Sequence, residues 1–351
     1  MVFSSLPFLF LFLTVVLLVS HLLPFKFRNF FLLLANLVFY AYGEPVYVLI
    51  MIASILVNFF AGVLMDKQPT QSRRRVVLVV GIVLNLAALG VFKYAGLFVD
   101  TLRGIPAFSS LPEVNIALPI GISFYTFQAV SYLIDVYWDD CEASHNFVNF
   151  ACYISLFPQL IAGPIVRYRD VNEQLVSRHE TPTLFNSGVR LFMVGMAKKV
   201  LLANQFGMLW ESVSADPVAA GAIGAWVGAC AYTLQIYFDF AGYSDMARGL
   251  GRMLGFEFCI NFNYPYISKS VTEFWRRWHI SLSTWFREYL YIPLGGNRCS
   301  KGRWVLNLFL VWAATGIWHG ASWNFVLWGL YFWVLLLVEK FVLLRWLKRA
   351  P

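Results

Sequence analysis

Residues 46–65 read VYVLIMIASILVNFFAGVLM, twenty positions without a charged side chain. A bilayer core about 30 Å thick is crossed by roughly 20 residues of helix, and a helix is required because lipid offers backbone N–H and C=O groups no partner. This run therefore predicts a membrane-spanning helix. Similar apolar runs recur along the chain, and the candidate spans are 6–23, 30–42, 46–65, 76–98, 116–138, 147–166, 191–210, 219–240, 304–318 and 323–347.

The composition of the whole chain agrees with a membrane protein. Of its 351 residues, 59% are hydrophobic, 18% are aromatic and only 13% are charged, which does not suit a surface that faces water. The net charge of +8 comes from basic residues in short loops, a pattern that suits anionic lipid headgroups and not nucleic acid. We expect a single all-α domain over residues 1–351, a polytopic membrane protein of about ten transmembrane or re-entrant helices.

Two of the predicted spans are interrupted by proline and glycine. One interruption is LPIG at residues 118–121, and the other is FPQLIAGP at residues 157–164. Broken helices at membrane depth persist only where they are buried in protein or line a wet cavity. Each interruption therefore indicates either a cavity or a kink that fits helices together.

Polar and aromatic residues mix in the segment 269–303, which we expect to be interfacial or re-entrant. Residues 270–273, SVTE, predict a capping box and the start of a helix. From there Trp275, Trp278, Leu282, Trp285 and Tyr289 recur at spacings of three and four, which predicts one aromatic stripe with His279 at its edge and Arg276, Arg277 and Arg287 off it. Such a helix suits the membrane interface, where the arginines would contact lipid headgroups or another anionic group.

His319 follows the short candidate span 304–318, whose 15 residues correspond to about 22 Å of helix. This length predicts that His319 lies within the depth of the bilayer, where an ionisable side chain usually faces a cavity or a bundle interior. A neutral imidazole there could act as a general base that activates a hydroxyl for acyl transfer. The alternative is a buried histidine bonded to a carbonyl group, an interpretation that we keep for His21, His145 and His179.

Other kinds of chemistry have little support in the sequence. The five cysteines form no CxxC pair, and there is no HExxH motif or ordered Ser-His-Asp set, so we expect no metal and no bound cofactor. Asp245 stands near the end of an apolar span. It could orient a histidine or a substrate hydroxyl, or it could pair with Arg248 or Arg252.

Seven blocks of sequence resemble one known family. They are LPIGISFYTF (118–127), IAGPI (161–165), YFDFAGYSDM (237–246), NFNYPYIS (261–268), EFWRRWHISLSTW (273–285), LGGNR (294–298) and WHG (318–320). Together they are similar to the membrane-bound O-acyltransferases, most closely to the alginate O-acetyltransferase branch. The resemblance implies helices arranged around a central tunnel in which a cytoplasmic acyl donor meets an acceptor. It places the family's invariant histidine at His319 and a second histidine at His279.

The resemblance further implies an enzyme of the bacterial inner membrane. Its substrates would be a cytoplasmic acyl donor such as acetyl-CoA and an exopolysaccharide such as alginate, and a periplasmic acetyltransferase would be its partner. The expected substrate-binding and donor-binding residues are Arg276, Arg277, Trp275, Trp318, Asn263 and Asp245. Two alternatives are D-alanyl transfer to teichoic acid by the same fold and a non-enzymatic polysaccharide transporter. The chain ends at Pro351, whereas members of this family are expected to continue through further helices, so a fragment and a branch with a shortened end both fit.

Overall fold

The computed structural model describes residues 2–114 and 116–344. Every regular element in this part of the chain is a helix, which confirms the predicted all-α fold. The helices form two compact units, one made of Met1–Val48 with Asn146–Asn261 and the other of Leu49–His145 with Phe262–Pro351. Each unit therefore combines two stretches that are far apart in the sequence.

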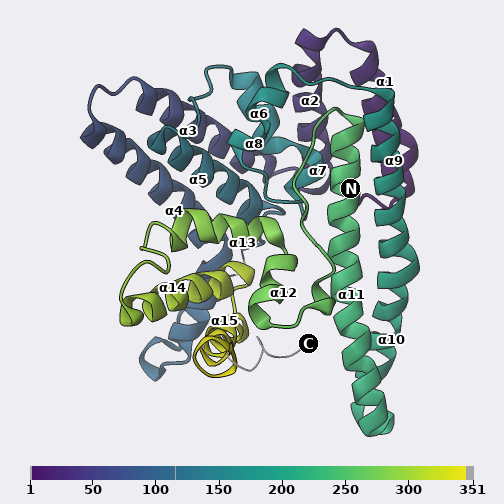
Figure 1. The fold of residues 1–351 in the computed structure, drawn as a ribbon, viewed down its shortest axis with the longest axis vertical. Coiled ribbons are helices and arrows are strands. Elements are labelled where there is room, and N and C mark those ends of the chain that lie inside the picture. The colour runs from purple at the N-terminus through teal and green to yellow at the C-terminus, as the bar shows by residue number, and fades with distance from the viewer. Residues whose placement is uncertain (1, 115, 345–351) are drawn as a thin grey trace. The chain divides into compact units, whose positions relative to one another are not determined.

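Two long helices that lie side by side dominate the first unit (Figure 1). One runs from α9 (Pro182–Ala197) through a π-helical segment, η3 (Lys198–Ala203), into α10 (Asn204–Ala215), and the other is α11 (Pro217–Met253). Their backbones approach closely, because a methyl group added to Gly195 would lie 2.5 Å from the carbonyl oxygen of Gly242. The other helices of this unit are η1 (Pro7–Leu13), α1 (Thr14–Leu22), α2 (Phe25–Gly43), α6 (Phe147–Ser155), α7 (Phe157–Leu160) and α8 (Tyr168–Val176).

The second unit begins with three long helices and continues with the shorter helices that carry the candidate site. Asn58 and Asn85 join the first two, because their buried amides exchange hydrogen bonds of 3.0 and 2.7 Å. Such amide pairs hold helices together where lipid gives no hydrophobic driving force. The helices are α3 (Val48–Asp66), α4 (Gln71–Arg103), η2 (Pro106–Phe108), α5 (Ile122–Trp138), η4 (Pro265–Ile267), α12 (Val271–Arg277), α13 (Ile280–Phe286), η5 (Arg287–Tyr291), α14 (Lys301–His319), α15 (Trp323–Val338) and η6 (Glu339–Leu343).

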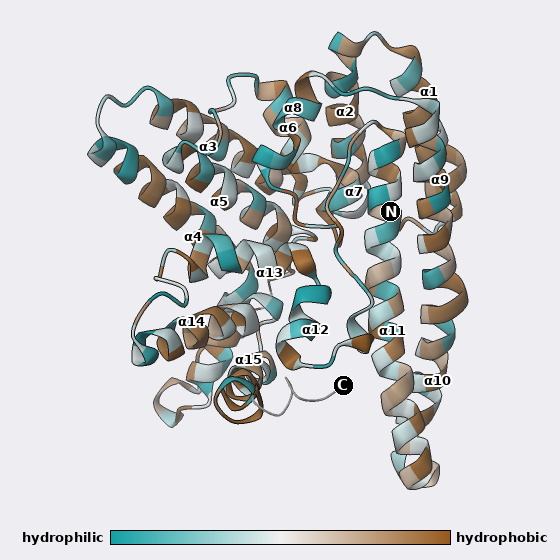
Figure 2. Cartoon of the chain, viewed as in Figure 1, coloured by the Kyte–Doolittle hydropathy of each residue, from teal (hydrophilic) through white to brown (hydrophobic). Residues whose placement is uncertain are grey.

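Among the described residues, four helices are long and apolar enough to cross a membrane: Val48–Asp66, Gln71–Arg103, Pro217–Met253 and Trp323–Leu343. On α4 the side chains of Val76, Val83 and Val91 are more than half exposed, which suits contact with lipid and not with water. Figure 2 shows hydrophobic residues along α3 and α4 and hydrophilic residues at the connection between them. A polytopic membrane fold is confirmed, whereas the predicted number of about ten spans is not.

Several predicted boundaries differ from the structure. The candidate span 147–166 is interrupted, as its proline and glycine residues indicated, because α6 ends at Ser155 and α7 covers only Phe157–Leu160. The candidate span 116–138 becomes helical only at Ile122, after Gly121 with a φ of 77°. The last three residues of the candidate span 323–347 lie outside the described residues.

The prediction that residues 304–318 form a short span was wrong. Ser300 accepts a hydrogen bond from the backbone N–H of Arg303, so α14 begins at Lys301. The helix has 19 residues, which correspond to about 28 Å, nearly the thickness of a bilayer core. The length of α14 therefore does not support the prediction that His319 lies within the depth of the bilayer.

The single aromatic stripe predicted for residues 275–289 was also wrong. Ser270 caps α12 as expected, but α12 ends at Arg277 and α13 starts at Ile280. Between them His279 has a φ of 43°, a left-handed conformation that a continuous helix does not contain. The aromatic residues before and after this break consequently pack against different partners.

Candidate active site

His319 is the last residue of α14, and aromatic rings surround its imidazole. The ring meets the edge of Trp328 at a centroid distance of 4.8 Å and that of Trp318 at 5.0 Å. Trp318 is buried, whereas His319 itself is partly exposed. An imidazole that is partly exposed among aromatic walls remains accessible to a reactant, as a general base requires.

Close packing of α14 against α15 sets the position of these rings. A methyl group added to Gly316 would lie 2.5 Å from the carbonyl oxygen of Phe325, and one added to Gly329 would overlap the carbonyl oxygen of Trp312. Next to His319, a side chain on Gly320 would overlap the ring of Phe325. Glycine is therefore required at these positions so that the two backbones can approach.

The ring of His279 also lies near Trp318, at a centroid distance of 5.9 Å. The structure therefore brings the two predicted histidines to one tryptophan. The side chain of His279 is almost completely buried, and this burial lowers its pKa well below the usual value, with a smaller contribution from His319. His279 is thus neutral at physiological pH, and its left-handed backbone marks it as a strained residue of the kind found at functional sites.

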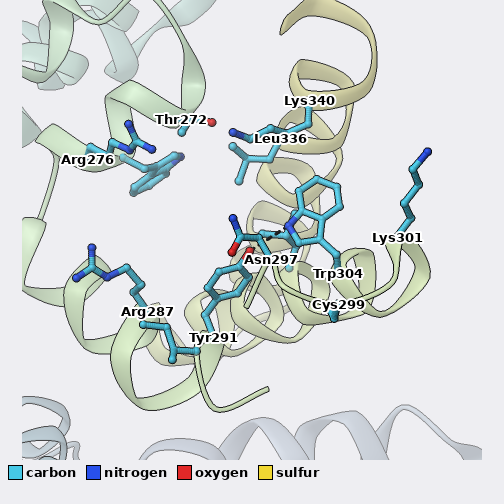
Figure 3. A pocket seen from close by; sticks show the side chains of 13 residues that line it. Thr272, Arg276, Arg287, Tyr291, Asn297, Cys299, Lys301, Trp304, Leu336 and Lys340 are labelled. Carbon is cyan, nitrogen blue, oxygen red and sulfur yellow. Dashed lines mark hydrogen bonds between the residues drawn. The ribbon is translucent and has the colours of Figure 1, made fainter. Parts of the chain in front are cut away.

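A cavity of about 730 Å³ lies between α12, η5, α14 and α15 (Figure 3). Among the 13 described residues that line it, four are cationic and none is acidic. Tyr291 and Trp304 form part of its wall, where the indole N–H of Trp304 donates to the Tyr291 hydroxyl at 3.0 Å. The cationic lining residues are Arg276, Arg287, Lys301 and Lys340, and Trp275 stands among them. Cationic and aromatic side chains in one cavity suit an anionic ligand with a flat ring system.

Aromatic contacts connect this cavity with the histidine at the end of α14. Trp275, in the cavity wall, packs edge-on against Trp328 at 5.7 Å, and Trp328 in turn contacts His319. Two indole rings in contact therefore lead from the cavity wall to the imidazole of His319.

Three other predicted binding residues have different surroundings. Arg277, the last residue of α12, forms an ion pair of 2.9 Å with Glu273 and donates to the backbone carbonyl of Asn263 at 3.2 Å, so its contacts hold the end of α12. Asp245, in the first unit, pairs with Lys198 at 2.6 Å and with Arg248 at 3.4 Å. The pairing of Asp245 with Arg248 agrees with one of its two predicted roles, and direct contact of these residues with a substrate stays a prediction.

Sequence reasoning missed two residues at the site. Trp328 lies within the apolar run of α15, where nothing in the sequence distinguishes it from a lipid-facing tryptophan. Lys93 lies in α4, and its ammonium group contacts the peptide that joins Trp318 to His319. A lysine inside a predicted span is the signal that could have found it, since ionisable residues at membrane depth are functional candidates.

The described residues contain no group of three or more His, Cys, Asp or Glu side chains that could hold a metal ion. The site consists instead of two imidazoles, tryptophan rings and cationic side chains. Such a set can accept and donate protons and bind an anion, which is what acyl transfer to a hydroxyl requires.

Comparison with known proteins gives this site its family context. The family model described as MBOAT, membrane-bound O-acyltransferase family, matches residues 140–350. The chain is 47% identical over 346 residues to the probable alginate O-acetylase AlgI of Pseudomonas aeruginosa, an alignment that covers 97% of this chain and 66% of that protein. It is 34% identical to the peptidoglycan O-acetyltransferase of Helicobacter pylori, which covers 90% of this chain and 64% of that protein.

A third relative transfers a different acyl group according to its name. The chain is 31% identical over 248 residues to the teichoic acid D-alanyltransferase of Streptococcus thermophilus, which covers 66% of this chain and 58% of that protein. The chain thus spans about two thirds of the length of the curated relatives that it matches. The similarity to the alginate relative is both higher and more extensive than the similarity to the D-alanyltransferase.

Proposed function

The chain belongs to the membrane-bound O-acyltransferase family, and from this premise we propose that it transfers acetyl groups for the O-acetylation of an exopolysaccharide such as alginate. The donor is a cytoplasmic acetyl thioester, acetyl-CoA in the simplest case, and the protein works in the bacterial inner membrane. A periplasmic acetyltransferase completes the delivery to the polymer. The proposal is supported by 47% identity to an alginate O-acetylase and by the pairing of two histidines around Trp318.

In the proposed reaction His319 acts as the general base. Its neutral imidazole accepts the proton of an acceptor hydroxyl while that oxygen attacks the carbonyl carbon of the acetyl thioester. The new C–O bond forms, the C–S bond breaks, and the imidazolium returns the proton to the departing thiolate. A general base in this role typically contributes about 10² to 10⁴ in rate. The partial exposure of His319 is the single observation on which this role depends, because a sealed ring could not reach a hydroxyl.

His279 serves the same reaction from a buried position. Its ring and that of His319 both lie next to the Trp318 ring, and its lowered pKa keeps it neutral. A neutral histidine can donate one hydrogen bond and accept another, so it can orient an acceptor group or carry a proton onward.

The cationic cavity is the proposed site of the donor. Acetyl-CoA carries phosphate groups and an adenine ring, which match the guanidinium and ammonium groups and the aromatic walls of this cavity. Arg276 and Arg287 are the arginines that line it, whereas Arg277 is paired with Glu273. Arg277 therefore contributes mainly by holding the end of α12 in place.

The decisive experiment measures both the O-acetyl content and the total yield of secreted polymer in cells. We expect His319→Ala to reduce O-acetyl content to about 1% of wild type or less, at normal polymer yield, because the general base is lost. His279→Ala should also reduce acetylation. His145→Ala is the matched control. The expectation that His145 is buried against a carbonyl group was wrong, because it is exposed and pairs with Asp66, so the variant should behave as wild type.

Two outcomes would contradict the proposal. Normal acetylation by His319→Ala would refute a catalytic role for His319, and a loss of polymer yield with normal acetylation would indicate a transporter. The D-alanyltransferase alternative is tested with membranes that receive either labelled acetyl-CoA or labelled D-alanyl carrier protein. If label reaches the acceptor only from the carrier protein, the donor is D-alanyl carrier protein and not acetyl-CoA.

A further inference from the structure

Lys93 is the one charged residue between Arg75 and Asp100, a stretch that forms most of α4. The helix as a whole is apolar enough to cross a membrane. A lysine in such a helix is costly and normally faces the protein interior, where it has a specific partner. Its partners therefore indicate what it does.

The ammonium group of Lys93 is bound to the carboxyl end of α14. It donates to the backbone carbonyl of Trp318 and to the hydroxyl of Ser123, the latter at 3.2 Å. It also lies 5.6 Å from the centroid of the Trp318 ring, within the range of a cation–π interaction. The next residue, Tyr94, donates its hydroxyl to the carbonyl of Ile317. Two consecutive residues of α4 thus bind two consecutive carbonyls of the last turn of α14.

These two carbonyl groups lie at the C-terminal end of α14, where the helix itself provides no N–H groups to bind them. The last carbonyl groups of an α-helix have no N–H partner one turn further on, and α14 ends at His319. A cation near these groups is favoured by the helix dipole, and a hydrogen bond from an ammonium group is stronger than one from a neutral donor. The lysine is therefore a charged cap on α14, supplied by a neighbouring helix.

We propose that Lys93 is a positioning residue that fixes the direction of the His319 imidazole by holding the peptide between Trp318 and His319. This inference rests on the proposed function of His319. The oxygen that Lys93 binds belongs to the same planar peptide group as the nitrogen of His319. A hydrogen bond to that oxygen restricts rotation of this peptide plane. It therefore also restricts the position of the His319 Cα atom, from which the imidazole projects. The same ammonium group lies over the Trp318 ring, which is next to both histidine rings.

Three substitutions separate the charge of Lys93 from its hydrogen bond. Lys93→Arg keeps both, Lys93→Gln keeps a donor without the charge, and Lys93→Met keeps neither. Acetyl transfer is measured in membranes that contain the full chain, at varied acetyl-CoA concentration and equal amounts of protein. Lys67→Met is the matched control, since Lys67 is exposed at the end of α3 and should keep wild-type kinetics.

We expect Lys93→Met to lower kcat about 100-fold with the KM for acetyl-CoA unchanged, because a reacting group displaced by about 1 Å loses about this much. Lys93→Gln should be intermediate, and Lys93→Arg should recover most of the rate. Tyr94→Phe, which removes the neighbouring neutral hydrogen bond, should lower kcat less than Lys93→Met. A change in KM alone, or a failure of arginine to restore kcat in a normally folded protein, would overturn the positioning role.

His319→Ala in the same assay distinguishes the two levels of the inference. If His319→Ala is inactive and Lys93→Met has wild-type kcat, the positioning role of Lys93 is wrong and the proposed function survives. If His319→Ala is active, the proposed function itself is wrong. Thermal unfolding of each detergent-extracted variant shows whether it is folded, so a rate loss without a loss of melting temperature supports positioning.

Discussion

Gly316→Ala tests how strongly the position of His319 depends on the crossing of α14 and α15. Gly316 lies about one turn before His319, and its added methyl group would lie 2.5 Å from the carbonyl oxygen of Phe325. An ordinary contact needs at least 3.4 Å, so the helices must separate by about 0.9 Å, the difference between the two distances. Both groups belong to the helix backbones or are fixed to them, and rotation of a side chain cannot relieve the overlap.

The expected effects on stability and on rate differ in size. Overpacking costs about 1 to 3 kcal/mol, but alanine is favoured over glycine inside a helix by about 1 kcal/mol, so the net loss of unfolding free energy is about 0 to 2 kcal/mol. A reacting group displaced by about 1 Å, in contrast, loses about 100-fold in rate. We therefore expect a protein whose melting temperature falls by only a few degrees and whose acetyl transfer almost stops.

The assay measures acetyl transfer from labelled acetyl-CoA in membranes, together with the melting temperature of the extracted protein. Gly302→Ala is the matched control, because Gly302 lies in the first turn of the same helix and an added methyl group there meets nothing within 4 Å. It should transfer acetyl groups at the wild-type rate. A wild-type rate from Gly316→Ala would refute the idea that this helix crossing positions His319.

Three further predictions concern the cavity, the loop at residues 294–296 and the buried histidine. Replacing both Arg276 and Arg287 by alanine should raise the KM for acetyl-CoA at least about 10-fold, because two charge-assisted contacts to phosphate are lost; an unchanged KM would place the donor elsewhere. Asn307→Ala removes hydrogen bonds of 3.2 and 3.1 Å to the carbonyls of Leu294 and Gly296, so we expect a loss of about 1 to 3 kcal/mol in a thermal unfolding measurement. Because the pKa of His279 is lowered on folding, the unfolded chain binds more protons below pH of about 6.5, and the melting temperature should fall between pH 7 and 5. His279→Asn should weaken this pH dependence, and an identical dependence in the variant would contradict the assignment.

The long apolar helices could be predicted from the sequence because hydrophobic length alone specifies them. The run 46–65 corresponds to α3, Val48–Asp66, within two residues at each end. The start of α14 was missed because the candidate span 304–318 was set to begin after the charged residues Lys301 and Arg303, whereas the cap supplied by Ser300 allows the helix to begin among them. Local charge was therefore a weaker guide to a helix boundary than the capping residue.

The candidate site was predictable only in part. Both histidines were identified, and the structure places them around one tryptophan, but the break at His279 left no trace in the spacing of residues 275–289. A left-handed histidine depends on tertiary packing, which a helical periodicity cannot represent. Lys93, in contrast, could have been found by the reasoning that was applied to His319, since both are ionisable residues in apolar surroundings.

The left-handed backbone conformation at residue 279 affects which amino acids this position favours. Glycine adopts a φ of 43° freely, whereas most other residues hold this conformation at a cost of about 1 to 2 kcal/mol. Stability alone would favour glycine here, and under the proposed function the role of the His279 ring in the reaction offsets this loss. At residue 319 the helical backbone imposes no such preference, so a histidine there carries no comparable conformational penalty. Of the two proposed catalytic positions, 279 is therefore the one at which the side chain comes with a conformational cost in the backbone.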